Sequence, residues 1–141
     1  MSDEILVSKT AMIAHCVGRA REEYDKDPLT FFDDITRRDA ATLNVLRAWE
    51  AAVEMGDHVI GTYSLGEPDD ERAVFTLLAD TGWIDAALAE RLKHTGEFCR
   101  AEWDYQAGPL PALVTIVKRG LDDLQAFAQA LVARSSSTPV P

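Results

Sequence analysis

The spacing of its apolar residues constrains the fold of this chain more than any other feature of the sequence. In almost every segment these residues recur three or four positions apart, which is the repeat of one helix face. No run of four to eight residues alternates between apolar and polar side chains, as a half-buried strand would. The sequence therefore predicts an all-α protein.

Glycine, proline and capping residues divide this pattern into helices. Thr36, followed by Asp39 three residues later, resembles a capping box and predicts the start of the second helix. The expected helices run from Asp3 to the residue before Asp27, from Thr36 to about Tyr63, from Asp69 to Asp80, from Asp85 to about Tyr105, and from Pro111 to about Leu131.

Four of these helices carry apolar stripes that we expect to face the core. The broad apolar face of the first helix consists of Ile5, Met12, Ile13, Cys16, Ala20 and Tyr24. The stripe of the second helix consists of Leu46, Trp49, Val53 and Ile60. The fourth helix has a narrow seam of Leu88, Leu92, Cys99 and Trp103. The stripe of the last helix consists of Leu113, Val117, Leu121, Leu124, Ala128 and Leu131.

Two segments lie outside these helices. Pro28 blocks continuation of the first helix, and residues 27–35 are expected to form a packed connector because they carry a large apolar area. Its large apolar side chains are Leu29, Phe31 and Phe32. The last segment, residues 135–141, is rich in Ser, Thr and Pro and is expected to be disordered. Because the sequence contains no linker long enough to separate two domains, we expect residues 1–134 to form one domain.

Charge and cysteine content limit the classes of function. The chain has 14 Lys and Arg against 24 Asp and Glu, a formal net charge of -10, which disfavours general binding to nucleic acid or to an anionic membrane. Cys16 and Cys99 are far apart and are expected to be free thiols. No apolar run is long enough to span a membrane, so we expect a cytoplasmic protein.

The most concentrated polar face lies on the second helix, where Arg47, Glu50, Glu54, Asp57 and His58 fall within about 100° of arc. Mg²⁺ needs several oxygens that converge from one side, which carboxylates at this spacing could supply. The motif Glu54-x-x-Asp57, with Glu22-Glu23 on the first helix, resembles that of the all-helical Mg²⁺-dependent nucleotide pyrophosphatases. A solvated, ion-paired face is the simpler interpretation. We expect no metal and no other cofactor, with Glu50, Glu54 and Asp57 as the alternative Mg²⁺ ligands.

Histidine is scarce, and none of the three stands in an HExxH or CxxC setting that would specify zinc. His58 is the best placed to carry a proton, because it shares a helix face with carboxylates.

Three stretches of the chain together resemble one known family. They are residues 32–52 followed by Asp57-His58, residues 65–68 with 75–79, and residues 88–93 with 103–106. The first resembles the second-helix signature of the HepT-like HEPN proteins, and the second resembles the family's connector and third helix. The resemblance extends from about residue 5 to residue 133 of the 141.

This resemblance implies a HEPN-type up-and-down bundle of about five helices that forms a homodimer. It also implies the toxin of a toxin–antitoxin pair, cutting RNA without a metal. In the family, an Arg, four residues, a His and then Asp-Tyr stand at the end of the fourth helix. The resemblance assigns the His to activation of the ribose 2′-hydroxyl and the Arg to stabilisation of the phosphate. The antitoxin is a minimal nucleotidyltransferase that attaches AMP to the Tyr, which matches Tyr105.

The chain departs from this pattern at the two catalytic positions. Aligned on Asp104-Tyr105, the His position holds Trp103 and the Arg position holds Phe98, or Cys99 if one gap is allowed. An indole offers only an N–H donor, so Trp103 cannot accept a proton.

The resemblance therefore predicts a catalytically degenerate member that acts through its nucleotidyltransferase partner. Arg100, Asp104 and Tyr105 remain as the site residues, with Tyr105 the one that would be modified by AMP. RNA as a partner stays open as an alternative, with His58 and either Arg100 or Arg47 acting from facing helices.

Overall fold

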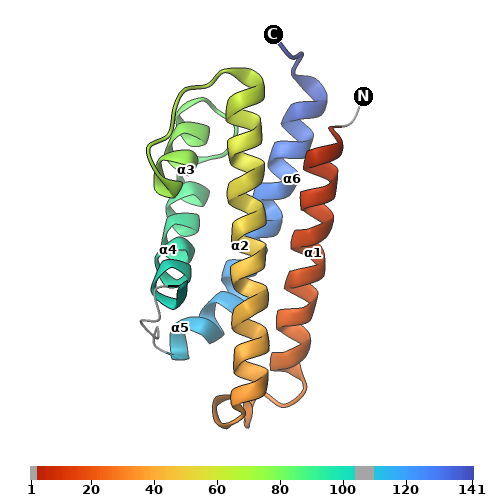
Figure 1. Cartoon of the computed structure of the whole chain (residues 1–141), viewed down its shortest axis with the longest axis vertical. Helices are drawn as coiled ribbons and strands as arrows, with labels where there is room; N and C mark the ends of the chain where they lie inside the picture. The colour runs from red at the N-terminus through yellow and green to blue at the C-terminus, as the bar shows by residue number, and fades with distance from the viewer. Residues whose placement is uncertain (1–2, 104–109) are drawn as a thin grey trace.

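The computed structural model describes residues 3–103 and 110–141, and all secondary structure in these residues is helical (Figure 1). The helices are α1 (Glu4–Asp25), α2 (Ile35–Tyr63), α3 (Glu71–Asp80), α4 (Ala86–Trp103), α5 (Leu110–Thr115) and α6 (Leu121–Ser137). A 3₁₀ turn over Phe31–Asp33 precedes α2, and a π-helical turn over Ile116–Gly120 joins α5 to α6. The predicted all-α fold is confirmed, and the predicted last helix is this continuous run of α5, π turn and α6.

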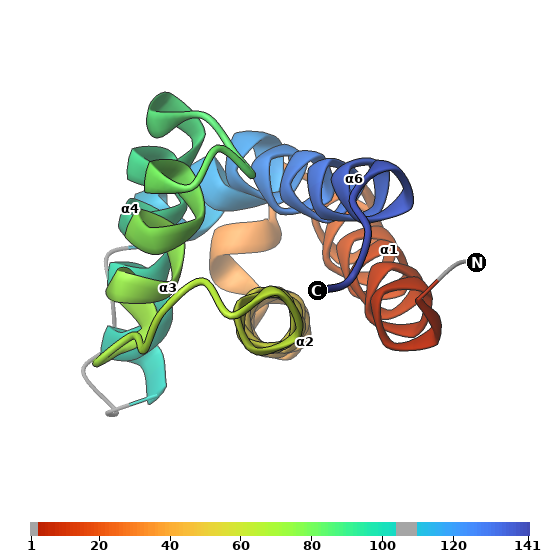
Figure 2. The ribbon, with the colours of Figure 1, turned by 90° about the horizontal axis from the view of Figure 1, so that it is seen from above.

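The helices form a bundle in which α2 is central. Seen from above, α2 lies between α1 on one side and the neighbouring pair α3 and α4 on the other, with α6 packed beside α1 (Figure 2). The two chain termini lie at the same end of the bundle (Figure 1). None of the described helices is long and apolar enough to cross a membrane.

Because α2 is packed on several sides, it buries more than one stripe. Trp49 and Ile60 are buried as predicted, whereas Leu46 and Val53 are only partly buried. Much of the remaining burial comes from small residues that allow close approach, namely Ala41, Ala48, Ala51, Ala52 and Gly56. A Cβ atom added at Gly56 would lie 2.5 Å from Cγ1 of Val74. The stripe predicted from the sequence therefore covers only part of the buried surface of α2.

An aspartate caps the start of each of the four helices α1 to α4. Asp34, and not Thr36, caps α2, because its carboxylate accepts a hydrogen bond from the Arg37 backbone N–H at 3.1 Å. The other caps are Asp3, Asp70 and Asp85, whose carboxylates accept backbone N–H groups two or three residues later. The capping-box prediction thus placed the start of α2 within one residue but assigned the cap to the wrong side chain.

The connector between α1 and α2 packs only in part. Phe31 is fully buried, edge-on to Tyr24 at a centroid separation of 5.2 Å. Leu29 is 91% exposed and Phe32 is 40% exposed, so the expectation that all three side chains pack was wrong for these two. The turn is too short to fold back over the bundle, and only one of its side chains reaches the core.

The last helix ends later than the sequence predicted. All six residues of its predicted stripe are buried. The helix then continues to Ser137, into the segment expected to be disordered. The Tyr63 hydroxyl donates to the Thr138 carbonyl oxygen at 3.1 Å and lies 3.3 Å from the Ser135 hydroxyl. These contacts hold the end of α6 against the end of α2.

Candidate functional site

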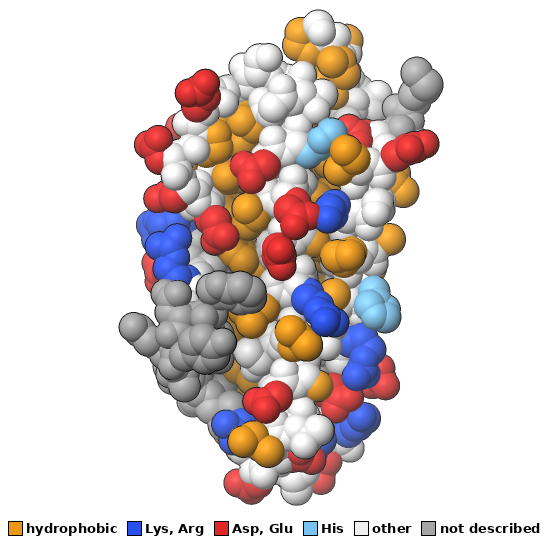
Figure 3. Space-filling model, viewed as in Figure 1, with side chains coloured by type: hydrophobic (Ala, Val, Ile, Leu, Met, Phe, Trp, Pro, Cys, Tyr) orange, Lys and Arg blue, Asp and Glu red, His pale blue; other side chains and the backbone are white. Residues whose placement is uncertain are grey.

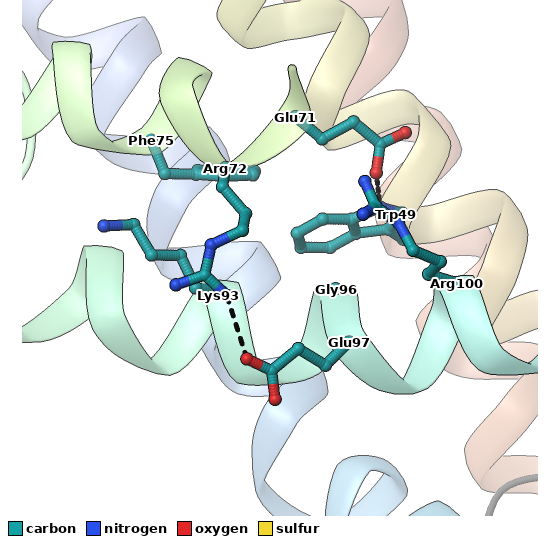
Figure 4. Close-up of a pocket in the computed structure, with 8 residues that line it drawn as sticks. All are labelled: Trp49, Glu71, Arg72, Phe75, Lys93, Gly96, Glu97 and Arg100. Atoms are coloured by element: carbon teal, nitrogen blue, oxygen red, sulfur yellow. Dashed lines mark hydrogen bonds and ion pairs between the residues drawn. The ribbon is translucent and has the colours of Figure 1, made fainter. Parts of the chain in front are cut away.

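A groove lies where α2, α3 and α4 meet, and we call it the Trp49 groove (Figure 4). Its cavity has a volume of about 80 Å³. The lining residues are Trp49 of α2, Glu71, Arg72 and Phe75 of α3, and Lys93, Gly96, Glu97 and Arg100 of α4. It lies at the C-terminal half of α4, the helix that leads into the family motif.

The floor of the groove is aromatic and rigidly placed. The Trp49 ring is 5% exposed and lies 5.0 Å from the Phe75 ring, and its Nε1–H donates to Glu71 Oε2 at 3.1 Å. A Cβ atom on Gly96 would lie 2.5 Å from Cζ2 of Trp49. Glycine at this position is what allows α4 to lie directly against the indole.

Charged side chains form the rim of the groove. Arg72 Nη1 donates to Glu97 Oε1 at 2.9 Å (Figure 4). Lys93 Nζ donates to Glu90 Oε1 at 3.0 Å. The Lys93 hydrogen bond lowers the pKa of the Glu90 carboxyl. Arg100 is exposed and makes no hydrogen bond or ion pair with any residue in the described ranges. The rim therefore combines two paired cations with one that is free to meet a ligand.

The structure separates the residue at the family's Arg position from the groove, whether that residue is Phe98 or Cys99. Phe98 is 8% exposed and Cys99 is 3% exposed, and both belong to the core. Trp103 is the last residue of α4, but its side chain, together with Asp104 and Tyr105, lies outside the described residues. Within the part of the chain that the structure describes, Arg100 is the one predicted site residue of the motif, and it lines the groove.

The carboxylates of the α2 face do not gather into a site. Glu54 pairs with Lys9 of α1, and Glu50 is exposed. Burial, and after it the charge of Glu71, raises the pKa of the Asp57 carboxyl. Figure 3 shows acidic side chains spread along this face, with hydrophobic ones between them. No group of three or more metal-binding side chains occurs among the residues that the structure describes, so the geometry does not support the Mg²⁺ alternative.

His58 is engaged at the end of the bundle that holds the termini. Its Nε2 lies 2.7 Å from Oδ2 of Asp3, the N-cap of α1. His58 follows Trp49 by nine residues on α2, which corresponds to about 13 Å along the helix axis. The structure therefore does not bring His58 and Arg100 together as a catalytic pair.

The Asp3–His58 contact predicts a pH dependence of stability. Partial burial alone would raise the pKa of Asp3, but hydrogen bonds from His58 and from two backbone N–H groups lower it below the ordinary value of 3.8. A carboxyl with a lowered pKa stabilises the fold above that value, and the contribution is lost as the pH falls through the folded-state pKa. Asn at position 3 keeps the helix cap but has no carboxyl that titrates. As the pH falls below 3.8, the free energy of unfolding in urea should therefore decrease more for the native protein than for Asp3→Asn. Equal acid sensitivity of the two proteins would contradict this.

The basic residues that lie close together in the sequence do not form one patch among the described residues. Arg37 is used structurally, since its guanidinium donates to the backbone carbonyls of Glu23 and Asp27. Arg91 pairs with Asp123 of α6, away from the groove. Lys93 and Arg100 do share the groove, together with Arg72, which the sequence did not single out. A glycine inside a helical pattern, Gly96, was the one signal that pointed to a close contact here.

Comparison with known proteins agrees with this fold. A family model described as Ribonuclease HepT-like matches residues 13–131. The mRNA nuclease HepT of Shewanella oneidensis is 33% identical over 132 residues, which is 93% of this chain and 98% of that protein. The rebuilt and re-refined structure of the tri-AMPylated Shewanella oneidensis HEPN toxin in complex with MNT antitoxin has a TM-score of 0.88 at 31% identity, covering 93% of this chain and 98% of that one.

A crystal structure of the toxin-antitoxin with AMP-PNP gives a TM-score of 0.87 at 30% identity, covering 93% of this chain and 99% of that chain. The match therefore extends over nearly the whole fold, including α4 and the groove. This chain belongs to the HepT-like ribonuclease family, the HEPN toxins of toxin–antitoxin systems.

Proposed function

We propose that this protein is a HepT-like member of a toxin–antitoxin pair that has lost the ribonuclease mechanism and acts through a minimal nucleotidyltransferase partner. One observation carries the proposal. The positions that the family pattern gives to Arg and His are occupied by Phe98 and Trp103, and Phe98 is 8% exposed in the core.

The chemistry of RNA cleavage explains why this substitution matters. Attack by the ribose 2′-hydroxyl needs a group that accepts its proton and a cation that stabilises the developing phosphate charge. Phe98 supplies no charge, and the indole of Trp103 supplies no acceptor. Arg100 could bind phosphate, but the sequence contains no histidine after His94 that could act with it. The net charge of -10 further weakens the attraction of RNA.

An RNA cleavage assay tests the loss of activity. We expect the purified protein to leave RNA intact, in contrast to the family's enzymes. Cleavage that disappears on replacing Arg100 or Tyr105 would overturn the degenerate assignment. Cleavage that disappears in His58→Ala would instead favour the second candidate, an active ribonuclease with substitute residues.

The proposal includes a homodimer, as the family resemblance implies. Ile5 and Met12 of α1 are 48% and 46% exposed, although the sequence pattern placed them on the apolar face of this helix. Two exposed apolar side chains seven residues apart on one helix face are compatible with a contact between copies. Light scattering of the purified protein should give the mass of two chains. The mass of one chain would contradict this part of the proposal.

The partner part of the proposal concerns Tyr105. In the transfer step, the Tyr105 Oη atom attacks the α-phosphorus of ATP, the bond from that phosphorus to the β-phosphate oxygen breaks, and pyrophosphate leaves. The phenolic proton passes to solvent or to a base of the partner. The AMP-bearing toxin and the AMP-PNP complex among the similar structures support this assignment.

A further inference from the structure

The turn between α1 and α2 exposes three large apolar side chains, and we call residues 26–35 the α1–α2 tip. Leu29 is 91% exposed, Ile35 is 64% exposed and Phe32 is 40% exposed. The tip projects beyond the other helices, at the end of the bundle opposite the two chain termini (Figure 1). Large apolar side chains gathered on a protruding segment indicate a surface that another molecule covers.

One arginine fixes the backbone of the tip. The guanidinium of Arg37 donates to the carbonyl oxygens of Glu23 and Asp27 at 2.9 and 2.8 Å. The same guanidinium donates to Thr30 Oγ1 at 3.1 Å and lies over the Phe31 ring, 5.6 Å from its centroid. Because these contacts hold the turn before anything binds to it, docking at the tip costs little conformational entropy.

Acidic residues accompany the exposed apolar side chains. The aspartates in or next to the tip are Asp25, Asp27, Asp33, Asp34 and Asp39. The three cations of the same stretch already have partners. Arg37 is bound to the backbone, Lys26 pairs with Glu23 at 2.9 Å, and Arg38 donates to the Phe32 carbonyl oxygen at 3.1 Å. The tip therefore offers apolar contact within a negative field, which attracts cationic groups and repels phosphates.

We propose that the α1–α2 tip is a docking surface for a protein segment whose apolar side chains are flanked by Lys or Arg. The segment's apolar side chains cover Leu29, Phe32 and Ile35, and its cations meet the aspartates. An anionic membrane also accepts apolar side chains, but its surface repels these carboxylates, and RNA is repelled for the same reason. The inference does not depend on the proposed function, since no residue of the family motif takes part in it.

Fluorescence anisotropy with a labelled peptide tests this on the full chain. The probe is a short amphipathic peptide of leucine and lysine, and the reference is the same peptide with glutamate in place of lysine. We expect only the lysine peptide to bind, with an affinity that falls as the ionic strength rises. Leu29→Ser should raise its Kd at least about tenfold, because it removes apolar area that the peptide buries. Asp33→Asn should raise the Kd and reduce its dependence on salt.

Two variants at the other end of the bundle are the matched controls. Val140 is an apolar residue that is 64% exposed, as Ile35 is, and Asp69 is an exposed aspartate after α2. Val140→Ser and Asp69→Asn should bind the lysine peptide as the native protein does. Because Leu29 is exposed, Leu29→Ser should leave the circular dichroism spectrum and the urea midpoint unchanged, so a loss of binding is not a loss of folding.

Several results would overturn the proposal. One is the absence of saturable binding of the lysine peptide, and another is equal binding by the native protein and Leu29→Ser. Leu29-dependent binding to phosphatidylserine vesicles, or to an RNA oligonucleotide, would assign the tip to a membrane or to RNA instead. If Leu29→Ser halves the mass of the native protein in light scattering, the tip is a contact between copies of this chain.

Discussion

Phe75→Ala is expected to lower the free energy of unfolding by about 3–5 kcal/mol. Phe75 is fully buried, and its ring lies 5.0 Å from Trp49 of α2 and 5.3 Å from Phe127 of α6. Together with Val74 and Leu78, it packs α3 against the long helices, and it is the largest of the three buried side chains of α3. Truncation removes the apolar contact and leaves a cavity that the three helices cannot close. Urea unfolding followed by circular dichroism measures the loss.

Leu29→Ala is the matched control for this experiment. Leu29 is also a large apolar residue, but it is 91% exposed in the connector before α2. Its truncation should change stability by less than about 0.5 kcal/mol, the usual range for exposed sites. A loss of similar size in both variants would contradict the packing described here, because it would mean that the connector contributes as much as the core.

Helical spacing predicted the elements well where a helix has one buried face. All six residues of the stripe predicted for the last helix are buried, because α6 packs against the bundle on one side and its other side meets water. The prediction left out Ile116 and Phe127, which are buried on the same side. The same method was less successful for α2, where neighbours on several sides bury alanines and Gly56 as well as Trp49 and Ile60. A helical wheel gives the direction of large apolar residues but not the number of neighbours around the helix.

The Trp49 groove could not be predicted from the sequence, because its residues come from three helices. Arg72, Lys93 and Arg100 are each ordinary exposed or half-exposed cations when considered alone. What brings them together is the packing of α3 and α4 beside Trp49, which periodicity does not specify. The acidic face of α2 shows the opposite case, since carboxylates on one convex helix face point apart, and Glu54 finds its partner on α1 instead.

Tyr105→Phe is expected to abolish AMP transfer by the nucleotidyltransferase partner. Phenylalanine keeps the ring but lacks the Oη atom that forms the new bond to phosphorus, so no adenylyl ester can form at this position. The measurement is intact mass spectrometry of the protein after co-expression with the partner, or after incubation with the partner and ATP. The native protein should gain one or more AMP units, and the variant should gain none.

The chain contains two other tyrosines, and these serve as internal controls. Tyr63 donates its hydroxyl to the Thr138 carbonyl oxygen at 3.1 Å and packs on Trp83. Tyr24 is half-buried, with its ring against Phe31. Both hydroxyls lie on helices away from the family motif, so Tyr63→Phe and Tyr24→Phe should gain AMP as the native protein does.

Modification that persists in Tyr105→Phe but disappears in Tyr24→Phe or Tyr63→Phe would contradict the assignment of Tyr105. If the native protein is modified but the unmodified protein does not cleave RNA, the modification has a role other than silencing a nuclease. Phe98 and Trp103 occupy the family's Arg and His positions. In such a chain, the AMP group would change the protein's surface and its contacts with a partner. For this protein, transfer to Tyr105 is thus a test of regulation separate from the test of catalysis.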